Sequence, residues 1–597
     1  MIANDFVHAC EQGLEHASLA IKPNSEAKTI ALAEQGDSTG GIVTPLEFVE
    51  TDFGEEKIAT LPDPESSGAD SVSQEVELNL CDRVKNFALE QGCKIYLNQD
   101  NEAWVTVPVN DHFEELPVDG ARYMQWIHHK WLESGGQILS RHVLSATSAT
   151  FATLAAFGDQ RYKVYLRVAH VDGEIYVDLS NEKHQVVHIW ANGWEILDQS
   201  PVKFARTAGM LPLPTPSLGG DISCLREFIN APGDDSWSLI LAWILGAYSD
   251  GPFPALIVTG EQGSCKSSAC RFIRQLIDPA RVELAMSPRE TRDVMIAAKN
   301  SHVTAFDNIS SISQSLSDTL CGLSTGAAHR ERKYHTNNGE ESQFCAKRPV
   351  LLNGIDLSMK GDLLSRSVLV SLPAIADENR KDEKKLLAEF EAAKPEILGA
   401  IFTVLSGILK NLPTTQLKEK PRMADFALWM TAAEPALGWQ PGTFMSHYDR
   451  NRDDAAELAI ESDSFGTAVR DAVLNDPSNI VNLDWKTLTA SVAANQTKGW
   501  PTSSKQVATR LKRLAPALRH FGIEFIQRRT GNKRYYEFIK QGSNVAYVAT
   551  WQTQAESLTD SASFDQNAAP DRISDVAGQE QMWQPEQCEE ETEVIGE

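Results

Sequence analysis

The chain has 597 residues, of which 42% are hydrophobic, and its formal net charge at pH 7 is −27. That length predicts several domains, because domains commonly contain about 100–200 residues, and the hydrophobic content suffices for real cores. The acidic balance argues against a protein that coats nucleic acid with its whole surface. Any nucleic-acid contact would therefore depend on a local patch of opposite charge.

Nine cysteines are scattered along the chain, without a Cys-x-x-Cys pair or histidine partners at zinc-binding spacing. This usage is typical of reduced thiols in an intracellular protein. The N-terminus has no signal-peptide pattern, and the longest apolar segment, Trp237–Tyr248, is too short to span a bilayer. We therefore expect a soluble cytoplasmic protein with no membrane partner.

Residues 1–76 are expected to be a mostly disordered acidic region. From about residue 21 onward this region is rich in Glu, Asp, Ser, Gly and Pro and poor in aromatic residues. Such a composition cannot bury enough surface to offset the entropy lost on ordering. An acidic linker that orders against a partner is the alternative.

Residues 77–210 are expected to form an accessory α+β domain. Helical periodicity and apolar alternation predict helices over Val84–Glu90, Ala121–Ser134 and Arg141–Phe157, a strand pair over Lys94–Leu97 and Ala103–Val107, and a meander over Tyr162–Val168, Glu174–Leu179, Val186–Trp190 and Trp194–Leu197. No chemistry stands out there, and the adjacent His128 and His129 face different sides of a helix. A Pro/Gly-rich linker over 211–220 follows.

The stretch from Pro254 to Ile277 predicts a site for nucleotide phosphates. An apolar run, Pro254–Val258, indicates a buried strand, and Ala269–Ile277 has helical spacing. Between them lies Gly-Glu-Gln-Gly-Ser-Cys-Lys-Ser-Ser, a loop of small residues that ends in a Lys-Ser pair. The loop amides and the helix N-terminus would direct positive partial charge at the phosphates.

Each residue type in this loop has an expected role with ATP and Mg²⁺. Lys266 would reach the outer phosphates, and the Ser267 hydroxyl would bind the magnesium ion. The residues expected to contact the nucleotide are Gly260, Glu261, Gln262, Gly263, Ser264, Cys265, Lys266, Ser267 and Ser268. A chance match in a turn rich in serine and glycine is the alternative.

Cys265 departs from the usual pattern, in which a glycine precedes the lysine. A side chain there would crowd the loop unless the backbone angles suit a residue other than glycine. Lys266 and the helix N-terminus would favour its thiolate, although an inert small residue is the simpler expectation.

A second strand, His302–Asp307, ends in an acid that can hold the magnesium ion directly or through water. The next residue is Asn308, whose amide can orient water but cannot take its proton. Hydrolysis would then be slow or would use another carboxylate. Glu261, Glu290 and Asp293 are the candidates that lie nearest along the sequence.

Two further strands have polar residues at their ends. The run Arg348–Asn353 ends in an asparagine that can sense the γ-phosphate or position the water, with a plain Asn-Gly turn as the alternative. Arg366 precedes another apolar strand and can complete the site of a neighbouring subunit by stabilising transition-state charge. A salt bridge from Arg366 to Asp356 or Asp362 is the alternative.

A basic segment, Thr325–His335, interrupts the acidic chain between the second and third strands. A ring-shaped ATPase that follows a nucleic-acid strand needs such a loop in its pore, where it grips phosphates by charge and bases by stacking. Arg330, Arg332 and Lys333 would supply the charge. A solvated surface hairpin is the alternative.

The C-terminal third is expected to contain a helical lid, a winged helix and an acidic tail. Residues 381–475 have helical periodicity over Leu386–Phe390, Ile397–Leu409 and Met423–Ala436. Over 476–541, two predicted helices, Trp485–Ala494 and Lys505–Phe521, precede a hairpin that turns at Gly531-Asn532. This unit is basic, as a DNA contact requires, and Arg528, Arg529, Lys533 and Arg534 lie on its hairpin. A winged helix that contacts only protein is the alternative, and the tail, 542–597, is expected to be disordered.

The ordered motifs allow a family resemblance to be stated. The loop at 260–267, Ala305-Phe-Asp-Asn308, Arg348-Pro-Val-Leu-Leu-Asn-Gly354 and Gly361-Asp-Leu-Leu-Ser-Arg366 resemble P-loop ATPases of phages, prophages and integrated elements. Those ATPases are similar to superfamily 3 helicases and poxvirus-type primase-helicases of the AAA+ class. The resemblance continues through Lys420–Glu434 and covers roughly residues 160–540. It implies a ring-forming motor, often hexameric, that acts in the replication of the element.

The sequence thus predicts an α/β protein with an AAA+-like P-loop ATPase core over 217–380, an N-terminal α+β region, a helical lid and a C-terminal winged helix. The expected function is that of a DNA-dependent ATPase, a replicative DNA helicase that uses ATP and Mg²⁺. Single-stranded DNA in the pore, a duplex or fork at the winged helix and further copies of the chain would be its partners. A non-motor ATP switch that binds DNA and a regulatory or antiphage-defence ATPase are the alternatives.

Overall fold

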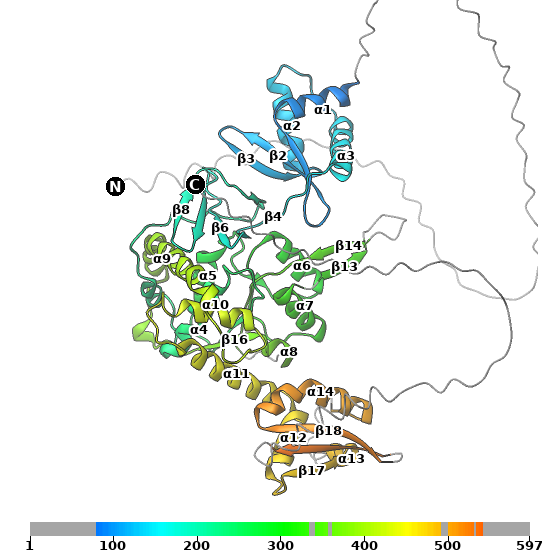
Figure 1. The fold of residues 1–597 in the computed structure, drawn as a ribbon, viewed down its shortest axis with the longest axis vertical. Helices are drawn as coiled ribbons and strands as arrows, with labels where there is room; N and C mark the ends of the chain where they lie inside the picture. Colours follow the sequence, from blue (N-terminus) through cyan, green and yellow to red (C-terminus); the bar gives the residue numbers. More distant parts are fainter. Residues whose placement is uncertain are drawn as a thin grey trace, which may run out of the picture. The chain divides into compact units, whose positions relative to one another are not determined.

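The computed structural model describes residues 79–326, 328–332, 341–355, 361–490, 500–530 and 533–540 (Figure 1). All of them belong to one compact unit, Glu77–Glu597. The disorder predicted for 1–76 and for the tail 542–597 lies outside the described residues, as do Asp356, Lys333 and the turn at 531–532.

A five-stranded, all-parallel sheet with the order β11-β12-β15-β10-β16 forms the centre of the fold. Its strands are β10 (Ala255–Gly260), β11 (Ala285–Met286), β12 (Thr304–Asp307), β15 (Val350–Asn353) and β16 (Ser367–Leu372). The apolar strands predicted from the sequence therefore lie side by side. Since parallel strands end at one edge of a sheet, the residues at their carboxyl ends gather there.

Helices connect and cover these strands (Figure 1). They are η1 (Ile222–Glu227), α4 (Gly233–Gly246), α5 (Lys266–Ile277), α6 (Thr291–Asn300), α7 (Gln314–Thr325) and α8 (Gly361–Leu364). Every residue of α4 from Trp237 to Gly246 is buried, as expected for a helix that is apolar on all sides. The indole of Trp243 donates a hydrogen bond to the carbonyl of Pro254, 2.8 Å away, just before β10.

The N-terminal part of the described chain contains three helices and two antiparallel sheets. The helices are α1 (Leu80–Glu90), α2 (Ala121–Glu133) and α3 (Arg141–Phe157). The first sheet contains β1 (Lys94–Leu97), β2 (Ala103–Val109) and β3 (His112–Pro117). The second sheet contains β5 (Val168–Val171), β6 (Glu174–Asp178), β7 (Val186–Trp190) and β8 (Gly193–Leu197). β3 was not predicted, because two glutamates and a terminal proline give it a weak strand propensity.

The first strand of the predicted meander is wrong in its bounds. Two short strands, β4 (Val164–Tyr165) and β5, replace the single run Tyr162–Val168, and β4 pairs with β9 (Lys203–Phe204) in a separate sheet. Arg167 lies between the two strands and is fully buried. Its guanidinium must reach polar partners in the interior, so the chain turns inward there.

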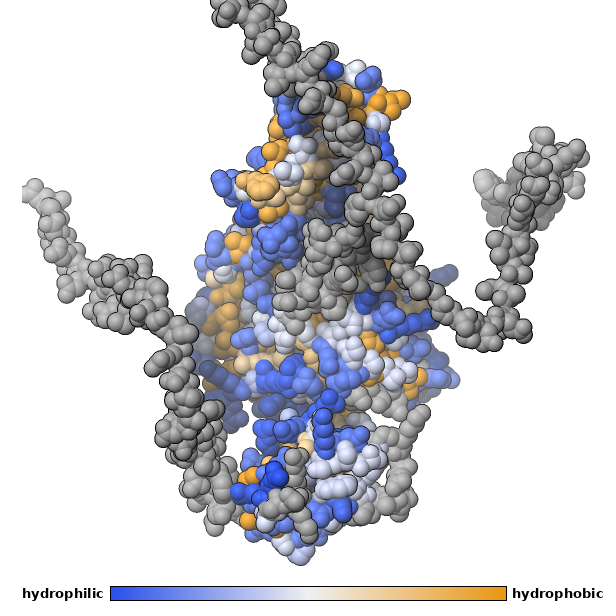
Figure 2. Space-filling view, turned by 90° about the vertical axis from the view of Figure 1, so that its right-hand side faces the viewer, coloured by the Kyte–Doolittle hydropathy of each residue, from blue (hydrophilic) through white to orange (hydrophobic). Residues whose placement is uncertain are grey.

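The helices after the central sheet include one that is longer than predicted. α9 (Glu383–Asn411) continues through Pro395, where two helices were expected, and α10 (Ala424–Ala433), α11 (Thr443–Glu461) and α12 (Ser464–Asn475) follow. By length and composition the stretch Glu383–Thr414 could cross a membrane, but 61% of its apolar window is buried inside the protein. It packs on η1, α10, β7 and β8, as a core helix does. The face drawn in Figure 2 is mostly hydrophilic among its coloured residues.

The C-terminal described residues form a three-stranded antiparallel sheet and two helices. The elements are β17 (Ile480–Asp484), α13 (Trp485–Ala490), α14 (Ser504–His520), β18 (Ile523–Thr530) and β19 (Lys533–Lys540), with the strand order β17-β19-β18. Ser503 caps α14, because its hydroxyl accepts a hydrogen bond from the Gln506 amide. The hairpin was predicted, and β17 was not.

A buried ion pair joins the β5–β8 sheet to the central sheet. Arg167 Nε lies 3.0 Å from Asp278 Oδ1, and the Arg167 guanidinium also donates to the carbonyls of Asp178 and Leu211. Asp278 Oδ2 accepts the amides of His302 and Val303. Burial opposes ionisation of this carboxyl, but Arg167, Arg274 and these amides hold its pKa below the usual range.

We expect Arg167→Ala to destabilise the protein by about 3–5 kcal/mol, because it leaves the buried Asp278 carboxylate without its cation. Thermal unfolding measures the loss, with the exposed Arg141→Ala as the control. The depressed pKa stabilises the fold above the unfolded-state pKa of about 3.9. The difference between wild type and variant should therefore shrink as the pH falls below that value. A variant as stable as the control would contradict this account.

Candidate functional site

The predicted phosphate loop lies between β10 and α5, at the carboxyl edge of the central sheet. Lys266 begins α5, and its Nζ donates to the carbonyls of Gly260 and Glu261, each 2.7 Å away, and to Ser264 Oγ at 3.3 Å. Its ammonium thus lies against the loop, beside the helix N-terminus, which also favours anions. Glu261, Gln262 and Gly263 are exposed, whereas Ser267 and Ser268 are partly buried.

Ser267 and Asp307 meet across the edge of the sheet. Ser267 Oγ, in the first turn of α5, donates to Asp307 Oδ1 over 3.0 Å, and Asp307 is the last residue of β12. The two residues are 40 positions apart in the sequence and are brought together only by the parallel fold. A hydroxyl and a carboxylate are hard oxygen ligands of the kind that Mg²⁺ prefers.

The backbone at Cys265 is in the left-handed region, with φ 57° and ψ 32°. A residue other than glycine is strained in this region. The backbone angles at position 265 are therefore those that favour glycine, the residue usual before the lysine of such loops. The side chain is exposed, so the strain comes from the backbone rather than from crowding. Glycine is required more strictly at Gly260, where an added Cβ would lie 2.3 Å from the carbonyl oxygen of Leu372.

Asn308 and Asn353 are linked to each other behind the acid strand. The Asn308 amide donates to Asn353 Oδ1 over 3.0 Å, and Asn308 is exposed in the left-handed region, with φ 54°. Asn353 is only 2% exposed. Asn353 therefore fixes the turn that follows Asp307.

The three carboxylates considered as bases occupy different positions. Glu290 and Asp293 form a capping box at the start of α6, and Asp293 Oδ2 accepts the amides of Arg289 and Glu290. That bonding already occupies Asp293 as a helix cap. Glu261 is the exposed carboxylate of the phosphate loop itself.

Arg366 is paired with Asp362, as the alternative interpretation of its sequence position predicted. Arg366 Nη1 contacts Asp362 Oδ2, while Arg422 Nη2 donates to Asp362 Oδ1 over 2.8 Å. Arg422 also donates to the Ser365 hydroxyl over 2.7 Å. Burial opposes ionisation of Asp362, but the two arginines hold its pKa below the usual range. One carboxylate therefore holds two partly exposed guanidinium groups side by side.

Arg380 lies against the predicted phosphate loop, a contact that the sequence did not indicate. A Cβ built on Gly263 would lie 2.7 Å from Arg380 Nη2, so the guanidinium lies directly against the phosphate loop. The amide of Ile375 donates to the Gly263 carbonyl over 3.2 Å, which holds the intervening segment on the loop. Arg380 pairs with Asp377 at 3.4 Å and is about half exposed. Only its position after the last sheet strand could have indicated this role.

The predicted DNA contacts lie on two hairpins. Arg330 and Arg332 belong to β13 (Ala328–Arg332), which pairs antiparallel with β14 (Glu341–Cys345). The other hairpin, β18–β19, brings Arg529 directly opposite Arg534. Arg528 Nε, however, donates to Glu537 Oε2 over 2.9 Å, so its charge is partly neutralised.

Two family models match the chain. Residues 222–455 match the model described as "Actinomycete integrative conjugative element replication protein", and residues 482–558 match that of the "AICE RepA C-terminal domain". Together they cover just over half of the chain, and no curated protein matches it.

Solved structures offer distant likenesses. The "A form apo structure of NrS-1 C terminal region-CTR" is 11% identical over 76% of this chain and 99% of that chain, with a TM-score of 0.34. The "SCCmec type IV Cch - active helicase" is 11% identical over 75% of this chain and 93% of that chain, with a TM-score of 0.38.

We expect Cys265→Gly to stabilise the protein by up to about 1 kcal/mol, because it removes left-handed strain, partly offset by the greater entropy of unfolded glycine. Thermal unfolding of the variant measures this gain. Cys224→Gly, in the 3₁₀ helix η1, is the matched control and should destabilise. A loss of stability in Cys265→Gly would show that the thiol contributes more than its backbone costs.

Proposed function

The chain belongs to the replication-protein family of actinomycete integrative conjugative elements, and from this premise we propose that it is a DNA-dependent ATPase that acts as the element's replicative helicase. The single observation that carries the proposal is the 3.0 Å contact between Ser267 Oγ and Asp307 Oδ1. In P-loop ATPases such a pair holds Mg²⁺ against the β- and γ-phosphates. The loop from Gly260 to Ser268 would then hold the phosphates of ATP.

The other site residues act around that centre. Lys266 would leave the loop carbonyls for the outer phosphates, and Asn308, held by Asn353, would orient the attacking water. Because an amide cannot accept the proton of that water, a carboxylate has to do so. The exposed Glu261, within the loop itself, is the proposed base. In this proposal the chain has an AAA+-like arrangement, with the core over 217–380, the lid over 381–475 and the winged helix over 476–541. Residues 77–210 form the accessory domain.

Further copies of the chain would complete each site in a cytoplasmic ring. Arg366 and Arg422 share one carboxylate, so their combined charge exceeds that of their acidic partner. Such an excess of positive charge suits a neighbour's ATP, whose transition-state charge an arginine in trans can stabilise. Arg366 is the proposed finger, and Arg422 holds the same carboxylate from the other side.

DNA would be held at the two basic hairpins. Arg330, Arg332 and Lys333 would line the pore and contact a single strand, and Arg528, Arg529, Lys533 and Arg534 would contact a duplex or fork. The register of β18 and β19 supports the second contact, because it brings the positions of Arg529 and Arg534 opposite each other on one hairpin, and clustered basic residues are typical of a DNA contact.

ATP turnover with and without single-stranded DNA tests the proposal. We expect DNA to stimulate turnover several-fold, and Lys266→Ala to abolish it, because the lysine holds charge that develops on the γ-phosphate. Lys384→Ala, an exposed lysine at the start of α9, is the matched control. Turnover that neither DNA nor Lys266→Ala alters would refute the proposed site.

A second candidate function, a non-motor ATP switch that binds DNA, is favoured by Asn308. A residue that cannot take a proton suits a protein that holds ATP to assemble and hydrolyses it slowly. Strand displacement on a forked duplex distinguishes the two functions. A helicase separates the strands in an ATP-dependent manner, whereas a switch binds the fork and leaves it intact.

We expect Arg380→Ala to raise the KM for ATP about tenfold with little change in kcat. The Arg380 guanidinium lies against the phosphate loop and would stabilise bound ATP and the transition state equally, so its loss should affect KM rather than kcat. A tenfold rise in KM corresponds to a loss of about 1.4 kcal/mol of binding free energy. Steady-state kinetics measures both constants, with the exposed neighbour Lys381→Ala as the control. A fall in kcat at unchanged KM would assign Arg380 to the transition state instead.

A further inference from the structure

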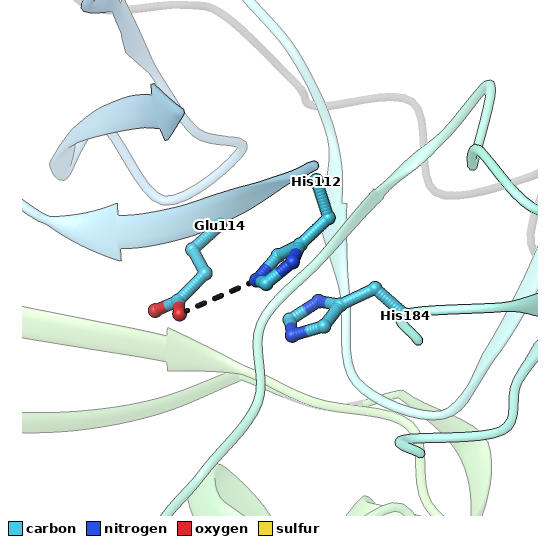
Figure 3. Close-up of side chains that lie close together, drawn as sticks. All are labelled: His112, Glu114 and His184. Carbon is cyan, nitrogen blue, oxygen red and sulfur yellow. Dashed lines mark ion pairs between the residues drawn. The ribbon is translucent and has the colours of Figure 1, made fainter. Parts of the chain in front are cut away.

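Away from the nucleotide site, three potential metal ligands converge where β3 approaches the loop between β6 and β7 (Figure 3). His112 and Glu114 lie on β3, and His184 lies in the loop. One ligand atom from each residue lies within 4.8 Å of the others. We propose that His112, Glu114 and His184 bind one divalent transition-metal ion, with Zn²⁺ as the best fit.

The His112 ring is oriented as a metal ligand requires. Its Nδ1 lies 3.3 Å from Asp111 Oδ1, and its Nε2 lies 3.7 Å from Glu114 Oε1. Nε2 is buried and has no hydrogen-bond partner among the described residues. A proton on Nδ1, directed at the Asp111 carboxylate, leaves the Nε2 lone pair free, which is the usual pairing behind a metal-bound histidine.

His184 is held next to His112 by a structured turn. Asn181 Oδ1 accepts the amide of Gln185 at 3.0 Å, and the Asn181 carbonyl accepts the amide of His184 at 3.1 Å. The backbone at His184 is left-handed, with φ 56°. The turn therefore places a ligand atom of His184 within 4.8 Å of those of His112 and Glu114.

The charges around the cluster come from four residues. Arg122 donates to both oxygens of Glu114, at 2.9 and 3.2 Å, which orients the carboxylate and leaves it lone pairs for a metal. Arg206 pairs with the buried Asp178, and Asp111 is exposed beside His112. Glu114 and Asp178 thus neutralise these two arginines, which reduces their repulsion of a divalent ion.

The ring geometry sets one requirement for binding. The two imidazoles are stacked, with centroids 3.6 Å apart and planes inclined by 17°, so their lone pairs lie in nearly parallel, separated planes. A metal ion must lie close to the plane of each ring, and therefore one ring has to turn. His184 is partly exposed and can do so. Two imidazoles and one carboxylate then match the three-protein-ligand set of zinc, with water as the fourth ligand.

The proposed ion would fasten the β1–β3 sheet to the β5–β8 sheet. One polar link already joins β3 to the chain beyond β8, because Lys203 Nζ, in β9, lies 3.0 Å from Glu115 Oε1. Metal binding would add a second link from the other face of β3, since residues 114 and 115 alternate across a strand. Its role would be structural and independent of nucleotide binding.

Titration of the full chain, freed of metal by a chelator, with Zn²⁺ and with Co²⁺ tests this inference. We expect one high-affinity Zn²⁺ per chain in the presence of excess Mg²⁺, a tetrahedral Co²⁺ visible spectrum without thiolate charge transfer, and a rise in unfolding temperature with Zn²⁺. His184→Ala and His112→Ala should weaken Zn²⁺ binding at least tenfold. His129→Ala, an exposed histidine on α2, is the matched control.

Several results would overturn the inference. The first is the absence of Zn²⁺ binding, and the second is Zn²⁺ binding that persists unchanged in both histidine variants. The third is a Co²⁺ spectrum with thiolate bands, because such bands would place the ion on cysteines. If an alanine variant fails to fold, His184→Asn keeps a polar side chain in the turn, where asparagine tolerates a left-handed backbone. That variant should fold without metal and lack the Zn²⁺-dependent rise in unfolding temperature.

Discussion

A single buried carboxylate, that of Asp278, sets the relative position of the two halves of the proposed nucleotide site. It follows directly after α5 and, through Oδ2, holds the amides that precede β12. The loop residue Ser267 begins α5, and Asp307 ends β12. The 3.0 Å contact between these two residues therefore depends on one anchor at the far ends of two short elements. Arg167 compensates the charge of that anchor, so the β5–β8 sheet that carries it takes part in shaping the site.

The same edge of the sheet carries backbone strain. Cys265 and Asn308 both have a left-handed backbone, at φ 57° and 54°, and both flank the contact between Ser267 and Asp307. Strain of this kind persists only where the surrounding structure enforces it. At Asn308 the side chain of the buried Asn353 does so by accepting its amide. Cys265 lies between the end of β10 and the start of α5.

The sequence was informative wherever a signal was local. The strands β10, β12, β15 and β16 are short apolar runs, and the Lys-Ser pair fixes the start of α5, so the central sheet and its loop could be predicted. Contacts between distant segments left no such signal. Arg380 reaches Gly263 from beyond the last sheet strand, and His184 meets His112 through a turn. β3 is held by its partner β2 rather than by its own propensity. β17 was not predicted although it begins with Ile480 and Val481, which favour strands.

The measurement that tests the central claim most directly is electron paramagnetic resonance of Mn²⁺ bound in place of Mg²⁺ together with ADP. If Ser267 and Asp307 hold the metal ion, the wild-type protein should bind one Mn²⁺ in a nucleotide-dependent manner. Asp307→Asn and Ser267→Ala should each weaken that binding by at least tenfold, while Asp318→Asn, an acid on α7, should leave it unchanged. Nucleotide-dependent Mn²⁺ binding that survives both site variants would contradict the account.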